Sequence, residues 1–137
     1  MSESSVAKQV IVMRKDLGMR KGKMIAQGAH ASMKVLVDRS IQNVASLRDG
    51  DTLAIALDPA TREWLVSGRF TKVCVSVNSE AELDAIVANA RSAGVPCALI
   101  VDSGRTEFHG VPTKTCCAVG PAWADAVDAI TGALPLL

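Results

Sequence analysis

Four short apolar runs alternate with segments of helical character along most of the chain. They read KQVIVMR at residues 8–14, FTKVCVSV at 70–77, CALIVDSG at 97–104 and CCAVG at 116–120. Runs of this length that are bounded by loop-forming residues are typical of buried strands. The sequence therefore predicts four strands.

Helices are predicted between and after these strands, at residues 21–38, 59–67, 79–93 and 121–130. A proline stands at the start of the second and fourth helices, a position that proline favours, and a serine–glutamate capping box opens the third. Residues 41–58 remain open between an extension of the first helix and a separate helical segment.

This order of elements predicts a single α/β domain over residues 1–137, with residues 1–7 as a flexible N-terminus. We expect three layers, α/β/α, in which helices cover both faces of a four-stranded, mostly parallel sheet. Ligands gather beyond the carboxyl ends of parallel strands. The polar segments that follow the first and third strands are therefore predicted to meet at one end of the molecule.

A polar stripe interrupts the otherwise small and apolar first helix. Its residues Lys23, Gln27, His30 and Lys34 fall within a sector of about 60° at helical spacing. The alanine, glycine and serine residues around them allow the helix to approach the sheet closely, which would hold the stripe rigidly. The stripe is therefore either a catalytic or phosphate-binding surface, or simply the solvent-exposed face of the helix.

A second polar cluster, DSGRT, follows the third strand. Asp102 could orient a lysine, accept a proton or position a water, or it could cap a turn in which Gly104 supplies backbone freedom. If Asp102 lies near Lys23, each would keep the other charged, and Asp102 would be a poor general base. Thr106 and Thr115 offer hydroxyl groups on either side of the same loop.

The net charge of +1 hides an asymmetry between the two parts of the chain. Residues 1–39 hold eight Lys and Arg against three Asp and Glu, and the remaining residues hold seven against eleven. A basic end suits a polyanionic partner such as nucleic acid, although a solvated surface without a partner has the same composition. The basic residues in and beside the first helix are Arg14, Lys15, Arg20, Lys21, Lys23 and Lys34.

Several familiar classes of site are missing from the sequence. It contains neither of the two glycine-rich motifs that bind nucleotides, G-x-x-x-x-G-K-[ST] and G-x-G-x-x-G, and it lacks G-x-S-x-G. It also has too few aromatic residues for a base-stacking platform. Two histidines and no C-x-x-C spacing argue against a metal site. No apolar run approaches the roughly 18 residues of a membrane span, and the N-terminus does not resemble a signal peptide. We therefore expect a cytoplasmic protein without a bound metal.

The four cysteines, at positions 74, 97, 116 and 117, lie in or beside the apolar runs. We interpret them as buried, inert thiols rather than disulfide partners or metal ligands. A thiol enzyme that uses Cys116 or Cys117 is an alternative.

Taken in order, these segments resemble the type II peptidyl-tRNA hydrolases. DLGMRKGKMIAQGAHAS at residues 16–32 matches the family pattern D-L-x-M-x-K-G-K-x-x-A-Q-x-x-H-A. DSGRT matches the family loop D-A-G-R-T, and TCCAVGP and DAITGALPLL match its last strand and its tail. The resemblance runs from about residue 8 to the C-terminus. The chain departs from it at Ser103, which replaces alanine, and in the EFHGVPT segment that follows Thr106.

The resemblance implies cleavage of the ester between a peptide and the terminal ribose of tRNA, without a metal or organic cofactor. It also implies a single α/β domain with a mixed four-stranded sheet, a homodimer, and peptidyl-tRNA as the partner. The family's functional residues fall on Lys23, Gln27, His30, Asp102, Thr106 and Thr115. Docking of tRNA phosphates is expected at Arg14, Lys15, Arg20, Lys21, Lys34 and Arg105. The alternative is a non-catalytic module that binds tRNA or protein on the same scaffold.

Overall fold

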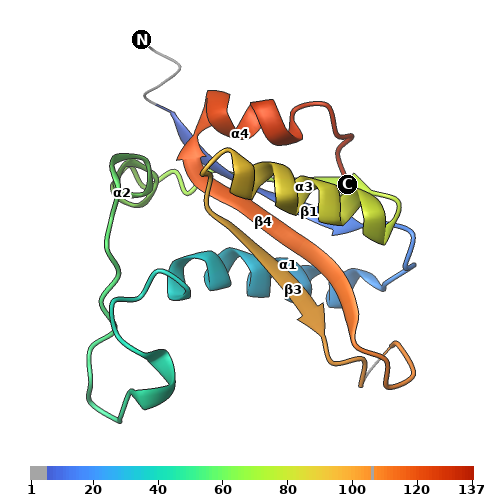
Figure 1. Cartoon of the computed structure of the whole chain (residues 1–137), viewed down its shortest axis with the longest axis horizontal. Coiled ribbons are helices and arrows are strands. Elements are labelled where there is room, and N and C mark those ends of the chain that lie inside the picture. Colours follow the sequence, from blue (N-terminus) through green and yellow to red (C-terminus); the bar gives the residue numbers. More distant parts are fainter. Residues whose placement is uncertain (1–5, 106) are drawn as a thin grey trace.

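The computed structural model describes residues 6–105 and 107–137. Figure 1 shows a curved sheet with helices on both of its faces. The strands are β1 (Ala7–Arg14), β2 (Lys72–Val77), β3 (Cys97–Asp102) and β4 (Thr113–Trp123). The helices are α1 (Lys21–Val37), the short 3-10 helix η2 (Val44–Ser46), α2 (Pro59–Val66), α3 (Glu80–Ser92) and α4 (Ala124–Thr131).

The four strands form one mixed sheet in the order β2-β1-β4-β3. Among the described residues, only β1 and β2 pair in parallel, whereas β4 is antiparallel to both β1 and β3. The expectation of a mostly parallel sheet is therefore wrong, and the mixed sheet is confirmed. The residues described between β3 and β4 form no helix, and the two strands pair as a hairpin and run in opposite directions. Because β4 runs opposite to both of its neighbours, β1 and β3 point the same way.

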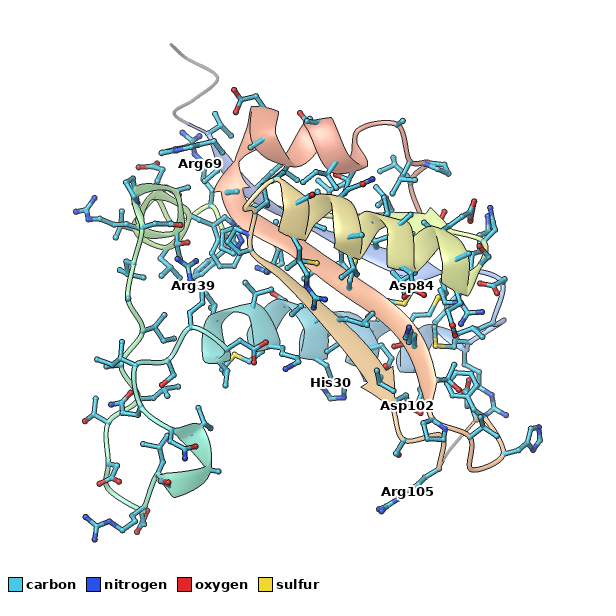
Figure 2. The ribbon with its side chains drawn as sticks, viewed as in Figure 1. His30, Arg39, Arg69, Asp84, Asp102 and Arg105 are labelled. Carbon is cyan, nitrogen blue, oxygen red and sulfur yellow. The ribbon has the colours of Figure 1, made fainter. Side chains whose placement is uncertain are left out.

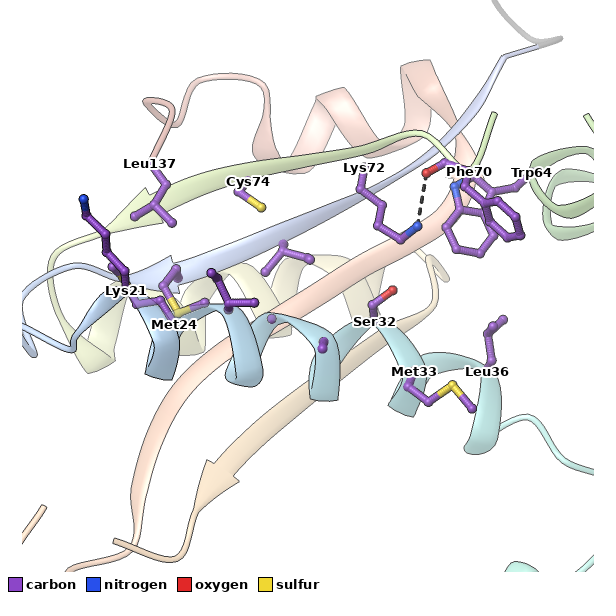
Figure 3. A pocket seen from close by; sticks show the side chains of 15 residues that line it. Lys21, Met24, Ser32, Met33, Leu36, Trp64, Phe70, Lys72, Cys74 and Leu137 are labelled. Atoms are coloured by element: carbon purple, nitrogen blue, oxygen red, sulfur yellow. Dashed lines mark hydrogen bonds between the residues drawn. The ribbon is translucent and has the colours of Figure 1, made fainter. Parts of the chain in front are cut away.

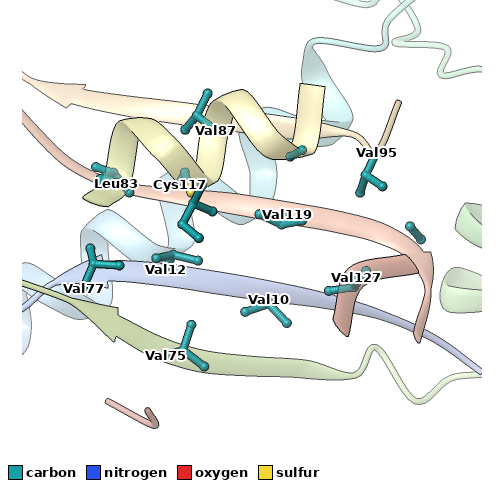
Figure 4. Close-up of a cluster of buried hydrophobic side chains, with 13 residues drawn as sticks. Val10, Val12, Val75, Val77, Leu83, Val87, Val95, Cys117, Val119 and Val127 are labelled. Carbon is teal, nitrogen blue, oxygen red and sulfur yellow. The ribbon is translucent and has the colours of Figure 1, made fainter. Parts of the chain in front are cut away.

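Helices cover the two faces of the sheet, as the three-layer prediction requires. In Figure 1, α3 and α4 lie on one side of the strands and α1 crosses on the other. Valines of β1 and β2 pack against α3 and α4 in the cluster drawn in Figure 4, together with Cys117 and Val119 of β4. A second cluster joins Ala31 and Val35 of α1 to the opposite face of the sheet. Successive strand residues point to opposite faces, which explains how one strand serves both clusters.

Strand β4 is much longer than the predicted run at residues 116–120. It continues through Pro121 to Trp123, so the prediction that Pro121 opens the last helix is wrong. The register between β1 and β4 shifts between Lys8 and Val10, opposite this proline. Such an irregularity accommodates a residue without a backbone N–H inside a sheet.

Residues 41–58 form neither a continuation of α1 nor a second long helix. They contain η2, and Ile55 forms an isolated bridge with Ser40, just after the end of α1. Several apolar side chains in this segment are exposed, among them Ile41 and Leu57. Within the described part of the chain, none of the helices has both the length and the apolar character that a membrane crossing requires.

The cysteines are only partly buried. Cys116 and Cys117 are fully buried in β4, Cys97 is half-buried, and Cys74 is exposed on β2. The prediction of buried thiols is therefore wrong for Cys74. Cys74 pairs in register with Ile11, whose side chain faces α1. Its exposure shows that α1 does not extend over β2.

Candidate active site

Lys23 and Asp102 meet at the carboxyl end of β3. The Lys23 Nζ donates a hydrogen bond to the Asp102 Oδ1 over 2.9 Å, and the two side chains are 14% and 13% exposed. Asp102 is the last residue of β3, and Lys23 lies in the first turn of α1. The two polar segments therefore do meet at one end of the molecule, as the sequence predicts, although β4 separates β1 from β3.

Gln27 is a second hydrogen-bond donor to Asp102, and it lies on the buried side of the ion pair. It lies one helical turn after Lys23, and its Nε2 donates to the same Asp102 Oδ1 over 3.3 Å. The Thr115 hydroxyl donates in turn to the Gln27 Oε1. Both Gln27 and Thr115 are buried, so their polar groups form hydrogen bonds within the protein rather than with solvent. We call Lys23, Gln27, Asp102 and Thr115 the Asp102 cluster.

A β-bulge directs Thr115 toward α1. Ile100 pairs with Cys116 and Val101 with Lys114, which leaves Thr115 as the extra residue of β4. Neighbouring strand residues normally point to opposite faces. Here Thr115 and Cys116 both contact α1, since the Cys116 thiol donates to the Gln27 carbonyl oxygen. Bulges beside active sites commonly re-aim a side chain in this way.

The second oxygen of Asp102 closes a turn. Its Oδ2 accepts the backbone N–H of Gly104 over 2.8 Å. The hydrogen bond from Lys23 lowers the pKa of Asp102, and the bonds from Gly104 and Gln27 act in the same direction, against the effect of burial. The two interpretations of Asp102 from the sequence, a lysine partner and a turn cap, are therefore both correct, one for each oxygen.

The remaining predicted catalytic residues are placed differently. His30 is exposed on α1, and no hydrogen bond joins it to the Asp102 cluster in the part of the chain that the structure describes. Thr106 lies outside the described residues. In Figure 2, the labels of His30 and Arg105 both lie near that of Asp102 at the end of β3. The polar stripe of α1 is thus divided: Lys23 and Gln27 face Asp102, and His30 and Lys34 face solvent.

Most of the predicted tRNA-docking residues are exposed, namely Lys15, Arg20, Lys21, Lys34 and Arg105. Arg14 differs from them because its side chain is only 11% exposed. It forms an ion pair with Asp16 at 2.6 Å and donates to the carbonyl oxygen of Lys114 over 3.1 Å. Arg14 therefore supports β4 at the residue before Thr115.

The structure adds Phe108, which the sequence analysis did not select, and places Glu107 of the EFHGVPT segment beside the start of α1. The Lys23 ammonium lies 5.8 Å from the centroid of the Phe108 ring, a cation–π contact from the loop between β3 and β4. Glu107 of the same loop forms an ion pair with Arg20 at 3.9 Å. Contacts from a loop this far along the chain have no local signature in the sequence.

Cys116 and Cys117, the candidate nucleophiles of a thiol enzyme, do not have the properties of reactive thiols. Burial raises the pKa of the Cys116 thiol to about 12, and the pKa of Cys117 is raised by its contact with Cys97 and by burial. Reactive thiols instead have lowered pKa values and partial exposure. Among the residues described, no group of three or more His, Cys, Asp and Glu side chains is arranged to hold a metal ion.

Comparisons with known proteins point to one family. A sequence model of the family described as peptidyl-tRNA hydrolase PTH2 matches residues 7–137. A peptidyl-tRNA hydrolase from Methanocaldococcus jannaschii is 43% identical over 130 residues, which cover 95% of this chain and 99% of that protein. The peptidyl-tRNA hydrolase of Saccharolobus solfataricus is 41% identical over 133 residues, with 95% and 98% covered.

A solved structure of more distant sequence shares the fold. It is a protein of unknown function from Agrobacterium tumefaciens, with a TM-score of 0.54 over 96% of this chain and 97% of that chain. The two sequences are 12% identical, so this similarity concerns the fold alone.

Proposed function

Because the chain belongs to the peptidyl-tRNA hydrolase PTH2 family, we propose that the Asp102 cluster is the catalytic centre of its hydrolase activity. The enzyme cleaves the ester between a peptide and the terminal ribose of tRNA and releases both products. The observation that carries the assignment is the ion pair between Lys23 and Asp102, at 2.9 Å and partly accessible to solvent.

Lys23 is proposed to stabilise the negative charge that develops on the ester. Attack of water on the carbonyl carbon produces an oxyanion, and a positive group held at that point lowers the barrier. Asp102 holds the Lys23 ammonium in place. With a lowered pKa, Asp102 is ionised at neutral pH but is a weak base, so its proposed role is to position Lys23 rather than to remove the proton from water.

Gln27 and Thr115 are proposed as positioning residues. The Thr115 hydroxyl donates to the Gln27 oxygen, which turns the amide nitrogen of Gln27 toward Asp102. This fixed orientation keeps the carboxylate, and through it Lys23, in one geometry. We propose that His30 and Thr106 contact the substrate or the attacking water, as the family resemblance implies.

The tRNA is proposed to dock through phosphate contacts with the exposed basic residues near the Asp102 cluster, Lys15, Arg20, Lys21, Lys34 and Arg105. Such contacts supply affinity without reading the sequence of the RNA. Arg14 is also among the docking residues expected from the sequence. Its contacts with Asp16 and the Lys114 carbonyl oxygen instead favour a role in holding β4 in place.

We further propose that the protein is a cytoplasmic homodimer. An apolar groove of about 720 Å³ lies between α1 and the part of the sheet that α1 leaves uncovered, and Figure 3 shows its walls. Its lining includes Met24, Ile25, Met33, Leu36 and Phe70. The groove runs along the flank of α1 toward β2, whereas Lys23 and Gln27 face β3, so a second copy seated there leaves the Asp102 cluster open. A cytoplasmic location agrees with the four free cysteines.

The proposed centre is tested by release of free tRNA from purified N-acetyl-aminoacyl-tRNA, in the presence of EDTA. We expect EDTA-resistant cleavage by the wild type and a fall in kcat/KM of about a hundredfold or more in Lys23→Ala, the loss typical of removing one oxyanion-stabilising group. Asp102→Ala is expected to lose a similar factor because it releases Lys23.

Folding is checked by thermal unfolding of each variant, and Lys8→Ala is the matched control. Lys8 is also paired with an aspartate, but its partner is Asp128 rather than Asp102, it lies at the start of β1, and it is not among the proposed docking residues. Cleavage by Lys23→Ala at nearly the wild-type rate would refute the assignment. A folded wild type that binds tRNA without cleaving it would instead support a docking surface.

A further inference from the structure

Strand β3 forms an open edge of the sheet. The opposite edge, at β2, is covered by the C-terminal tail: Ser76 N donates to the Pro135 carbonyl oxygen, and Leu137 N donates to that of Cys74. Strand β3 pairs with β4 on one side only. Across residues 6–105 and 107–137, no backbone hydrogen bond reaches its outer side.

The outward-facing groups can be identified from the hydrogen-bond pattern. Gly120 N donates to the Pro96 carbonyl oxygen, so Pro96 faces β4. Along an antiparallel strand, the residues that bond to the neighbour alternate with residues that face away. Ala98 and Ile100 therefore bond to β4. The N–H and C=O groups of Cys97, Leu99 and Val101 point away from the sheet.

This edge lacks the devices that usually protect one. Charged side chains, prolines within the strand and bulges normally prevent an edge strand from pairing with another chain. Here residues 97–101 read CALIV, and the extra residue of the bulge lies in β4, which leaves β3 itself regular. Val101 is 55% exposed. An unprotected edge of this kind is a surface for adding a strand.

The open edge ends at the catalytic centre, since Asp102 is the last residue of β3. The peptide part of a peptidyl-tRNA varies in sequence, and its constant feature is the backbone. Backbone hydrogen bonds to a sheet edge bind an extended peptide of any side-chain composition. On the basis of the proposed function, we infer that the outer edge of β3 binds the peptide part of the substrate as an added strand.

The chemistry of the substrate sets the direction of this strand. The scissile ester is at the C-terminal residue of the peptide, so that residue must lie at the Asp102 end of β3. The peptide then extends back toward Cys97 and runs parallel to β3. At about 3.3 Å per residue, the edge from Cys97 to Val101 accommodates roughly five peptide residues.

The first test compares N-acetylated substrates with one to eight residues that share the same C-terminal amino acid and tRNA. We expect kcat/KM to rise about tenfold or more, mainly through KM, and to level off near five residues, since each added hydrogen bond contributes a modest net gain. Equal kcat/KM at every length would overturn this inference but would leave the proposed function standing. No cleavage even of N-acetyl-aminoacyl-tRNA would overturn the proposed function itself, and the inference with it.

The second test methylates single backbone nitrogens of a five-residue substrate. Alternate residues of an added strand direct their N–H groups toward the edge. We therefore expect KM to rise for methylation at alternate positions and to change little at the positions between them. If the effect on KM does not alternate along the peptide, strand addition is contradicted, even if kcat/KM rises with peptide length.

A variant of the enzyme tests the same edge. Val101→Pro removes the outward N–H of residue 101 without removing a hydrogen bond to β4. Val101→Thr changes the side chain but keeps this N–H. We expect the advantage of the five-residue substrate over N-acetyl-aminoacyl-tRNA to disappear in Val101→Pro and to persist in Val101→Thr, with circular dichroism as the check on folding. A change of oligomeric mass in Val101→Pro would show that the edge pairs with a second copy of the chain, which would overturn the inference.

Discussion

Asp102 uses its two oxygens for different purposes. The Oδ1 accepts hydrogen bonds from Lys23 and Gln27, and the Oδ2 accepts the N–H of Gly104. A carboxylate with this many donors is favoured in its ionised form. It therefore holds a positive charge at a fixed position beside the loop that follows β3, which is what stabilisation of an oxyanion requires.

Gly104 is the residue that allows this arrangement. Its φ is +85°, and a Cβ atom added there would lie 2.2 Å from the carbonyl oxygen of Val111. We expect Gly104→Ala to lower the free energy of unfolding by more than about 1 kcal/mol, because it combines a left-handed conformation with a backbone clash. Its kcat/KM should fall as well, since the Asp102–Gly104 bond is displaced. Denaturant unfolding and turnover of N-acetyl-aminoacyl-tRNA measure the two effects.

Gly110→Ala is the matched control for this prediction. Gly110 has a similar φ of +79°, but none of the described residues has an atom within 4 Å of the added Cβ. It should lose only the stability that the left-handed conformation costs, with turnover close to that of the wild type. If the two variants lose equal stability and equal activity, the close approach to Val111 has no importance for the site.

At the scale of elements, the site depends on the register between β3 and β4. The bulge at Thr115 places two consecutive residues of β4 against α1, and both contact Gln27. Arg14 of β1 supports the residue before the bulge through the Lys114 carbonyl oxygen. The Asp102 cluster thus connects two strands and one helix, and Arg14 supports it from a third strand. Its polar contact with solvent is confined to Lys23 and Asp102.

Thr115→Val tests the contribution of this connection. Valine has the same shape but no hydroxyl, so the buried Gln27 oxygen loses its donor. We expect the free energy of unfolding to fall by about 1–3 kcal/mol, the cost of an unsatisfied buried polar group, and kcat to fall more than KM changes. Thr115→Ser keeps the hydroxyl and should restore most of the activity. Equal activity in the two variants would show that the hydroxyl does not position Gln27.

At the scale of the whole molecule, α1 separates two surfaces of different character. Toward β3 it presents the polar Asp102 cluster, and toward β2 it borders the apolar groove. Ile25 and Met33 on the groove side are exposed, as is Phe70 beyond the sheet. Exposed apolar side chains gathered along one groove are characteristic of an interaction site. The homodimer proposal assigns it to a second copy of the chain.

Ile25→Glu is expected to convert the dimer to a monomer, because a charge would be buried in an apolar interface. Ile41→Glu is the matched control: Ile25 and Ile41 are 74% and 72% exposed, but only Ile25 lines the groove. Sedimentation equilibrium of the wild type and both variants gives the mass directly. A monomeric wild type, or dissociation of both variants alike, would contradict the assignment of the groove.

Local patterns in the sequence determined most of the elements and one half of the site, but neither the extent of β4 nor the start of α4. Helical spacing placed Lys23 and Gln27 one turn apart on α1, and DSG encoded the turn that Asp102 caps. These two features follow from backbone geometry over a few residues, so they are visible without any knowledge of distant contacts. The meeting of the two polar segments was also predicted, but the shared direction of β1 and β3 that causes it comes from their common pairing with β4.

The tertiary structure alone decided which strands are neighbours, where β4 ends, and which part of the α1 stripe reaches Asp102. The insertion of β4 between β1 and β3 made the sheet mixed, and its bulge turned Thr115 toward Gln27. Pairing between strands far apart in the chain depends on competition among many long-range contacts, which a local pattern does not record. For the same reason, the exposed groove and the open edge of β3 became apparent only in the folded molecule.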